Sequence, residues 1–170
     1  LQGIISRQIN PFSPAVITVG SFQGGNKHNI ISDEVNLQLT VRTDSEETRE
    51  RVLTSIRDTA LNIGRLNGLP NDLLPIVRVG FESTPTTVNN YDAVHKVLPA
   101  WSEQLGYNPL DSSVRTGMGG EDFAFFTRTE HEVPGVFFSV GGTPPDVMER
   151  IEAGDMAPPP HHSPFFFIDP

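Results

Sequence analysis

The sequence predicts a mixed α/β chain whose first half is an antiparallel sheet backed by one helix. Residues 34–43 alternate apolar and polar side chains, which is the period of a strand with one face in water. Residues 44–68 carry apolar side chains at helical spacing. Two further segments, 15–22 and 74–81, are rich in β-branched residues. A single sheet with one face covered by the helix satisfies all of these patterns.

The predicted elements of the first half follow one another closely. Residues 1–10 have the composition of the end of a helix, and residues 15–22 predict a strand that leads into a turn rich in Gly and Asn. The long helix has Asp44 or Ser45 as its N-cap and acidic residues in its first turn, where they suit the helix dipole. An Asn-Gly pair at 67–68 ends it. Its apolar face comprises Val52, Leu53, Ile56, Ala60 and Ile63.

The second half predicts a separate unit. Residues 82–92 lack periodicity and are rich in Thr, Asn and Pro, which is typical of a connector. We therefore place a domain boundary near Thr87, which gives domains of residues 1–87 and 88–170. The elements predicted beyond it are a helix at 91–105 that closes at Gly106, a glycine turn and short helix at 117–126, a buried strand at 135–141, and a helical turn at 147–152 in an otherwise irregular loop.

The composition excludes several classes of protein. Twelve Lys and Arg against 21 Asp and Glu give a formal net charge of -9 that is spread along the chain, so no nucleic-acid partner is expected. No cysteine is present, which excludes disulfides, thiolate zinc sites and a Cys nucleophile. No apolar run is long enough to span a bilayer and no signal peptide precedes the first residue, so we expect no membrane partner and a cytoplasmic location.

The two ends of the chain have an unusual appearance. The chain opens without Met on LQGIISRQINP and stops at Pro170 directly after an extended run. We expect an internal piece of a larger protein, although a processed or recombinant chain would have the same ends.

The stretch PPPHHSPFFFIDP near the C-terminal end raises the question of a metal site, because His161 and His162 are adjacent. In an extended segment neighbouring side chains point to opposite faces, so at most one of the two faces such a site. Zinc takes three or four protein ligands, and the other histidines form no spaced cluster. These are His28, His95 and His131. Taken alone, the pattern favours histidines of a proline-rich loop, at the surface or partly buried, over a metal site.

Five segments of the chain, taken in order, resemble one enzyme family. They are VGSFQGGNKHNIISDEVNLQLTVRT, TPTTVNN, MGGEDFAFF, PGVFFSVG and HHSPFFFID. In this order and at these intervals they are similar to the aminoacylase and carboxypeptidase-type dinuclear metallohydrolases, the M-twenty metallopeptidases. The most similar subgroup is the amidohydrolases that cleave N-acyl amino acids such as hippurate and auxin conjugates. The resemblance covers nearly the whole chain. It rests on all five segments in their order, because a single HSP or GGED motif would be weak evidence for a family.

The resemblance implies a two-domain hydrolase. A large domain would hold two divalent metal ions, Zn or Mn, and a smaller ferredoxin-like lid would pair with a second subunit to give a homo-oligomer. Residues 1–87 would be the lid without its first strand, and residues 88–170 the C-terminal part of an α/β catalytic domain. The implied reaction is hydrolysis of the amide bond of an N-acyl amino acid or short peptide by a metal-activated water, with a glutamate as the base.

The resemblance also assigns a metal ligand and substrate contacts. The family's HSP histidine corresponds to His162, which would ligate one metal ion, with His161 as its neighbour. Asn29 and Arg42 match lid residues that grip the substrate's carboxylate in relatives. A guanidinium suits that role because it forms paired charge-assisted hydrogen bonds. The alternative is that Asn29 is a turn former and Arg42 a polar residue on the wet face of its strand.

The glycine turn matches the element that lines the family's substrate cleft. Gly119 and Gly120 would let the backbone approach the substrate. Glu121 and Asp122 would lie at the start of a helix behind the cleft. Acidic residues at a helix N-terminus are favoured by the helix dipole, which is a sufficient structural explanation by itself.

The chain departs from the family pattern in three ways. Ser32 stands where the family usually has Pro, which should not touch chemistry. The loop 141–160 is richer in proline and acid than expected, which leaves the substrate preference open. Most importantly, the Cys-Gly-His-Asp element, the paired glutamates with the general base, and the remaining His ligand would all lie upstream of Leu1. The chain would supply at most one metal ligand and no catalytic residue, so we predict that it is inactive alone.

Two other classes compete with the hydrolase hypothesis. A strand-strand-helix-strand unit with an open edge can act as a non-catalytic dimerisation or peptide-binding module. The run GGEDF at 119–123 is also one transposition away from the GGDEF hairpin of diguanylate cyclases. A cyclase would need that glycine turn between two strands.

Overall fold

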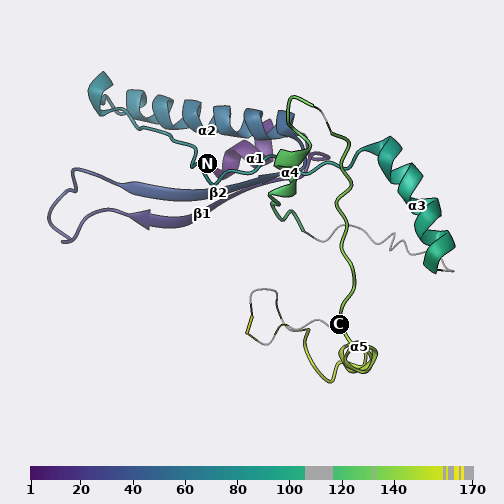
Figure 1. Cartoon of the computed structure of the whole chain (residues 1–170). Helices are drawn as coiled ribbons and strands as arrows, with labels where there is room; N and C mark the ends of the chain where they lie inside the picture. Colours follow the sequence, from purple (N-terminus) through teal and green to yellow (C-terminus); the bar gives the residue numbers. More distant parts are fainter. Residues whose placement is uncertain (106–116, 132, 159, 161–162, 165, 167–170) are drawn as a thin grey trace. The chain divides into compact units, whose positions relative to one another are not determined.

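The computed structural model describes residues 1–105, 117–131, 133–158, 160, 163–164 and 166 (Figure 1). They form two compact units, residues 1–136 and residues 137–170. The first unit contains the strands β1 (Ala15–Gln23) and β2 (Asn36–Thr43), the helices α1 (Gln2–Gln8), α2 (Glu46–Leu66), α3 (Tyr91–Leu105) and α4 (Phe123–Phe126), and a 3-10 turn, η1 (Asn71–Leu73). The second unit contains α5 (Pro145–Glu152).

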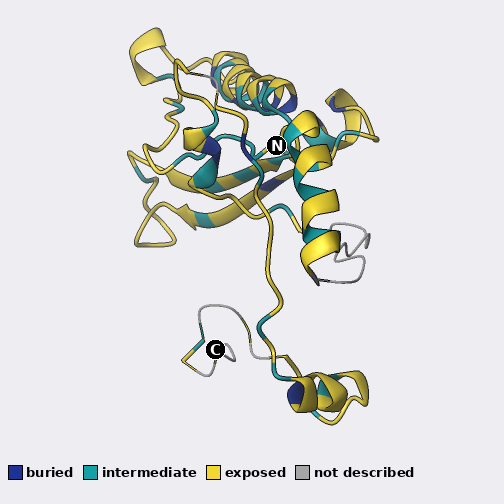
Figure 2. Cartoon of the chain, turned by 45° about the vertical axis from the view of Figure 1, so that its right-hand side comes forward, coloured by how far each residue is buried: buried dark blue, intermediate teal, exposed yellow. Residues whose placement is uncertain are grey.

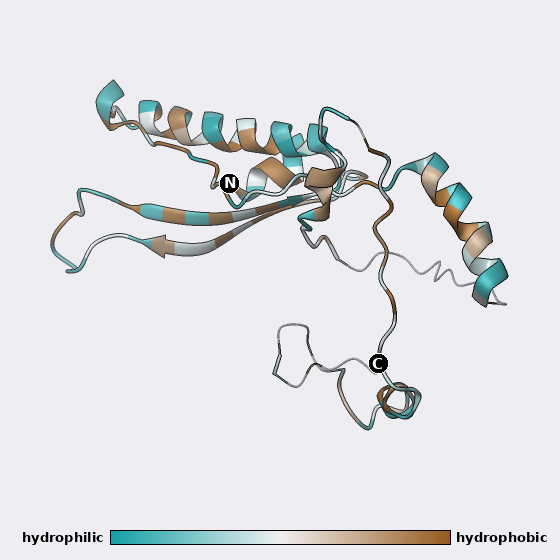
Figure 3. Ribbon diagram, viewed as in Figure 1, coloured by the Kyte–Doolittle hydropathy of each residue, from teal (hydrophilic) through white to brown (hydrophobic). Residues whose placement is uncertain are grey.

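Strands β1 and β2 form an antiparallel hairpin. Ile17 pairs with Val41 and Val19 pairs with Leu39, so these four apolar side chains share one face of the sheet. Apolar and polar residues alternate along β2, as Figure 3 shows. A register shift between Val19 and Ser21 adds one residue to β1, which increases the local twist. The alternation predicted for residues 34–43 is confirmed.

Helices α1 and α2 cover the apolar face of this hairpin (Figure 1). The core between them is a cluster of buried aliphatic residues, in which Val52 and Ile56 of α2 are 0% and 6% exposed. Its other members are Ile4, Ile9 and Ile17. Figure 2 shows that buried positions are few and that most of the described chain is exposed. The prediction of an antiparallel sheet backed by a helix is therefore confirmed.

The ends of α2 follow from local sequence. The Ser45 side chain accepts a hydrogen bond from the backbone N–H of Thr48 at 3.2 Å, so Ser45 and not Asp44 is the N-cap. At the other end the N–H of Gly68 donates to the carbonyl of Arg65 at 3.0 Å. Gly68 has φ +73°, a conformation that glycine adopts without strain. Both predicted ends of the helix are confirmed.

Two predicted strands do not form. Residues 74–81 and 135–141 have no strand pairing, and among the described residues the sheet contains β1 and β2 only. Phe81 is 96% exposed, and Val140 of the predicted buried strand is exposed as well. A strand requires a neighbouring strand that pairs with its backbone N–H and C=O groups in a regular ladder, and the described residues show no such ladder for either segment. Composition alone therefore predicted these strands wrongly.

The helices predicted in the second half are present. Residues 91–105 form α3, the glycine turn leads into α4, and the helical turn expected at 147–152 is α5. None of the helices in the described ranges combines the length and the apolar character needed to cross a membrane.

The burial of α2 predicts a large stability difference between two isoleucines of the same helix. Ile56→Ala should lower the free energy of unfolding by about 2–5 kcal/mol, because it leaves a cavity beneath a side chain that is 6% exposed. The matched control is Ile63→Ala, since Ile63 is 54% exposed and its loss should cost about 0.5 kcal/mol or less. Urea denaturation followed by circular dichroism measures both. Equal losses would contradict the core described above.

Candidate functional site

A groove of about 750 Å³ runs along β2 within the first unit. One wall is β2 itself, from Leu37 to Thr43. Facing residues come from the segment 77–80, from the connector at 82–87, and from the glycine turn at 118–120. The side chains of Arg49, Leu53 and Ile56 contribute from α2. This volume lies within the range of small-molecule binding sites.

Arg42 is held across this groove by the glycine turn. Its Nη1 donates a hydrogen bond to the carbonyl oxygen of Met118 at 2.7 Å, which joins residues 76 positions apart. Arg42 alternates with Val41 along β2, so its side chain leaves the face opposite the core. The guanidinium has five N–H donors in a fixed fork. Its remaining donors have no partner among the described residues, so they can meet a carboxylate.

Gly120 lies directly against the connector. A Cβ atom at this position would lie 2.7 Å from the Thr84 hydroxyl oxygen, which is too close unless the Thr84 side chain or the connector moves. Gly119, by contrast, has open space around it. The close approach at Gly120 brings exposed backbone of the glycine turn to the wall of the groove that Thr84 lines.

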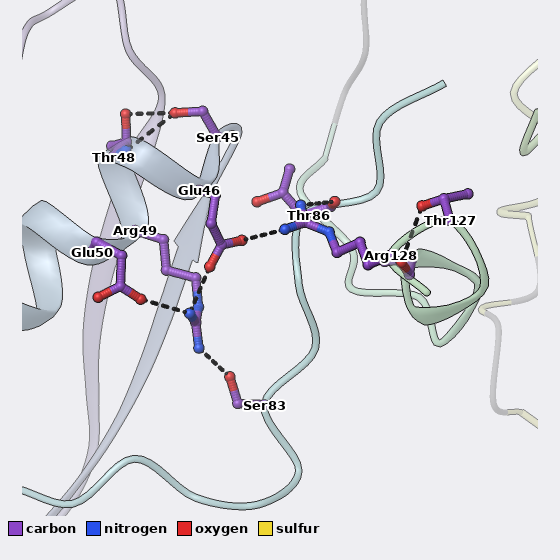
Figure 4. Close-up of polar contacts among 10 residues, drawn as sticks. Ser45, Glu46, Thr48, Arg49, Glu50, Ser83, Thr86, Thr127 and Arg128 are labelled. Atoms are coloured by element: carbon purple, nitrogen blue, oxygen red, sulfur yellow. Dashed lines mark hydrogen bonds and ion pairs between the residues drawn. The ribbon is translucent and has the colours of Figure 1, made fainter. Parts of the chain in front are cut away.

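A second set of polar contacts fastens the connector to the first turn of α2 (Figure 4). Arg49 pairs with Glu46 at 2.7 Å and donates to the Ser83 hydroxyl at 2.5 Å. Arg128, which follows α4, lies 3.4 Å from the other carboxylate oxygen of Glu46 and donates to the carbonyl of Thr86 at 3.0 Å. The 3.4 Å contact is an ion pair without hydrogen-bond geometry. This buried carboxylate oxygen therefore lies beside the positive charge of Arg128 but accepts no hydrogen bond from a described residue.

In this network Glu46 pairs with two arginines, Arg49 and Arg128. We therefore expect that removing the negative charge of Glu46 lowers the stability of the fold. Glu46→Gln should lower the free energy of unfolding by about 1 kcal/mol, because the pairs are partly exposed and therefore screened. Glu47→Gln is the matched control, since Glu47 lies exposed in the same helical turn and is not one of the carboxylates that pair with Arg49 or Arg128. The difference between the two variants should shrink in 1 M NaCl. A difference that persists unchanged in salt would contradict an ionic origin.

The structure brings together three of the site residues predicted from the sequence. Arg42, Gly119 and Gly120 all line the groove. Asn29 lies exposed in the loop between β1 and β2 and does not line it. His162 and its neighbour His161 are outside the described residues.

The two acidic residues predicted beside the glycine turn open α4, as expected. Glu121 and Asp122 are exposed, and their carbonyl oxygens accept hydrogen bonds from Ala124 and Phe125. The Asp122 side chain makes no capping hydrogen bond. The glycine turn leads into the helix α4, and the described residues show no strand on that side of it, whereas a diguanylate cyclase needs this turn between two strands.

Sequence reasoning missed the groove residues Arg49, Ser83 and Thr84. Arg49 resembles an ordinary helix-surface partner of Glu46 at i,i+3, and a connector rich in Thr gives no specific signal. Their role depends on contacts between distant segments. In the described ranges no three His, Cys, Asp or Glu side chains come close enough to hold a metal ion.

The groove and the helix-backed hairpin belong to the same unit, and the comparisons with known proteins concern this part of the chain most directly. Residues 3–65 match the family model described as peptidase dimerisation domain. The chain is 31% identical to thermostable carboxypeptidase 1 of Saccharolobus solfataricus over 83% of this chain and 33% of that protein. It is also 31% identical to hippurate hydrolase of Campylobacter jejuni, over 74% of this chain and 32% of that protein.

A solved structure supports the fold. A protein from methicillin-resistant Staphylococcus aureus, described as an aminohydrolase, matches with a TM-score of 0.59 and 23% identity over 75% of this chain and 31% of that chain. The resemblance inferred from the sequence is thus confirmed: residues 3–65 match the peptidase dimerisation domain, and the matched relatives include M-twenty-type amidohydrolases, deacetylases and carboxypeptidases. The chain spans about a third of the length of the curated relatives that it matches.

Proposed function

We propose that this chain is the lid and the C-terminal catalytic segment of a metal-dependent amidohydrolase that cleaves the amide bond of N-acyl amino acids or short peptides. The observation that carries this proposal is the groove in which Arg42 lies beside the glycine turn at 118–120. A guanidinium with unused donors recognises a carboxylate, and every N-acyl amino acid carries one. The names of the matched relatives, among them hippurate hydrolase, support the same substrate class.

Within this proposal each predicted site residue has a role. Arg42 binds the substrate's carboxylate, and the exposed backbone of Gly119 and Gly120 borders the bound substrate. Asn29, at the tip of the hairpin, reaches a substrate only when another part of the protein or a second subunit lies over it. Glu121 and Asp122 shape the turn from which α4 begins.

The metal centre belongs to the rest of the protein. The described residues do not assemble a donor set for a divalent ion, so no reaction step is assigned to the groove itself. His162 is the one ligand that we propose for this chain, to one of two Zn or Mn ions whose other ligands lie elsewhere. Residues 1–87 are proposed as the dimerising lid, residues 88–170 as part of the catalytic domain, and the cytoplasm as the location.

The first test of this proposal compares the two adjacent histidines in a polypeptide extended upstream of Leu1 to the length of the relatives. His162→Ala should lower activity on hippurate by about 100-fold or more and reduce the bound metal, because a direct ligand matters more than the groups behind it. His161→Ala is the matched control and should retain activity and metal. The 170-residue chain alone should neither hydrolyse hippurate nor retain zinc. Equal losses in both variants would contradict the role of His162.

The second test addresses the carboxylate site. In the extended polypeptide Arg42→Lys should raise KM for hippurate by about 10–100-fold with little change in kcat, because a lysine cannot form the paired hydrogen bonds. Arg51→Lys, on the exposed surface of α2, is the control and should leave KM unchanged. The amide analogue of hippurate, which lacks the carboxylate, should respond to neither substitution. An equal effect of Arg42→Lys on both substrates would remove the carboxylate role.

A non-catalytic dimerisation or peptide-binding module is the second candidate function. Two observations favour it. Residues 3–65 match a peptidase dimerisation domain, and among the described residues β2 pairs with another strand along one edge only. Analytical ultracentrifugation of the 170-residue chain separates this candidate from a monomeric enzyme fragment, since the module should dimerise without the rest of the protein.

A further inference from the structure

Arg128 joins two segments that lie far from it in the sequence. Its Nη2 donates a hydrogen bond to the carbonyl oxygen of Thr86 at 3.0 Å, and its Nη1 lies 3.4 Å from Oε2 of Glu46. Thr86 belongs to the connector and Glu46 to the first turn of α2 (Figure 4). The Arg128 side chain is 37% exposed and does not line the groove. It therefore binds the connector and α2 without being placed to contact a ligand in the groove.

The Glu46 carboxylate gives the Arg128 guanidinium a defined place. Oε1 of Glu46 lies 2.7 Å from Arg49, whereas its Oε2 atom is buried and accepts no hydrogen bond from a described residue. A buried carboxylate oxygen without a hydrogen bond is unfavourable unless a positive charge lies near it. Arg128 supplies that charge, so a neutral side chain at this position would leave the oxygen atom uncompensated.

A short hydrogen-bonded link connects Arg128 to the glycine turn. The turn leads into α4, where the N–H of Phe125 donates to the carbonyl of Asp122 at 3.0 Å. The N–H of Arg128 donates in turn to the carbonyl of Phe125 at 3.2 Å. The hydroxyl of Thr127 donates to the carbonyl of Ala124, whose side chain is fully buried. Because these contacts restrict the backbone of the link, an anchor at Arg128 also limits the freedom of the turn.

The glycine turn contacts the same connector at its own end. Gly120 packs so closely on Thr84 that a Cβ atom there would lie 2.7 Å from the hydroxyl oxygen. Arg128 binds the connector two residues further along, at the carbonyl of Thr86. The connector, the glycine turn, α4 and Arg128 therefore form a closed ring of contacts. Loss of the contact at Arg128 would open this ring.

We propose that Arg128 is a positioning residue of the carboxylate site. It holds the glycine turn so that the carbonyl of Met118 stays hydrogen-bonded to Nη1 of Arg42, at 2.7 Å. This bond uses one donor of the guanidinium and sets the direction of the donors that meet the substrate's carboxylate. Without Arg128 the turn gains freedom, and Arg42 loses more side-chain entropy when a carboxylate binds. The inference rests on the proposed function, because it assumes that Arg42 binds the substrate.

Nuclear magnetic resonance of the 170-residue chain tests the geometry without any reaction. The amides of residues 119–120 should have order parameters of about 0.85, as in rigid backbone. Arg128→Gln should lower them below about 0.6 and abolish the nuclear Overhauser effects between Arg42 and Met118. The matched control is Arg57→Gln, which replaces an exposed arginine of α2 and should change neither quantity. A mobile turn in the unsubstituted chain, or an unchanged turn in Arg128→Gln, overturns the proposal.

Kinetics of the polypeptide extended upstream of Leu1 separate positioning from a general effect on folding. Arg128→Gln should raise KM for hippurate by about 5–10-fold with little change in kcat, and should leave the kinetics of the amide analogue unchanged. Arg128→Lys keeps a positive charge beside Glu46 and should give a smaller rise. In an Arg42→Lys background Arg128→Gln should add no further rise, because its effect passes through Arg42. Arg57→Gln should again have no effect.

The outcomes distinguish this inference from the proposed function. If Arg42→Lys raises KM and Arg128→Gln does not, Arg42 binds the carboxylate without help from Arg128, and the positioning role is wrong. An equal effect of Arg128→Gln on both substrates, or a further rise in the Arg42→Lys background, makes Arg128 a structural residue only and also overturns the proposal. If Arg42→Lys itself leaves KM unchanged, the proposed carboxylate site fails and this inference fails with it.

Discussion

The structure of the first unit depends on the burial of one face of a two-stranded hairpin beneath α2. A hairpin of two strands is marginally stable in water unless another element covers its apolar face. Val52 and Ile56 provide that cover, and α1 adds Ile4 to the same cluster. Because alternate residues of a strand point to opposite faces, fixing Val41 in the core fixes Arg42 on the other side. The position of the candidate site residue is therefore a consequence of core packing.

Much of this arrangement could be predicted from local sequence. The alternation in β2, the helical spacing in α2 and the cap at Ser45 are signals carried by neighbouring residues, and the structure confirms them. The strand predicted at 74–81 failed for a different reason. Its β-branched residues describe side chains that suit a strand, whereas a strand also needs a backbone partner, and no local pattern shows whether one is present.

The candidate site shows the same division between local and long-range information. Arg42 and Met118 are 76 residues apart, so no spacing rule could predict their hydrogen bond. The family resemblance selected Arg42 and the glycines because it carries three-dimensional information from other proteins. It gave no indication of Arg49 and Ser83, which are joined by a contact between α2 and the connector. Residues that hold a groove in shape are thus harder to predict than residues that line it.

The polar and the apolar parts of the groove are mechanically connected through the connector. Residues 77–80 line the apolar part of the groove, and the same stretch continues to Ser83, which Arg49 binds, and to Thr84, against which Gly120 packs. The glycine turn in turn accepts the hydrogen bond from Arg42 at the carbonyl oxygen of Met118. The contacts that hold the connector against α2 therefore also fix the backbone that lies opposite Arg42, because they restrict the same short stretch of chain.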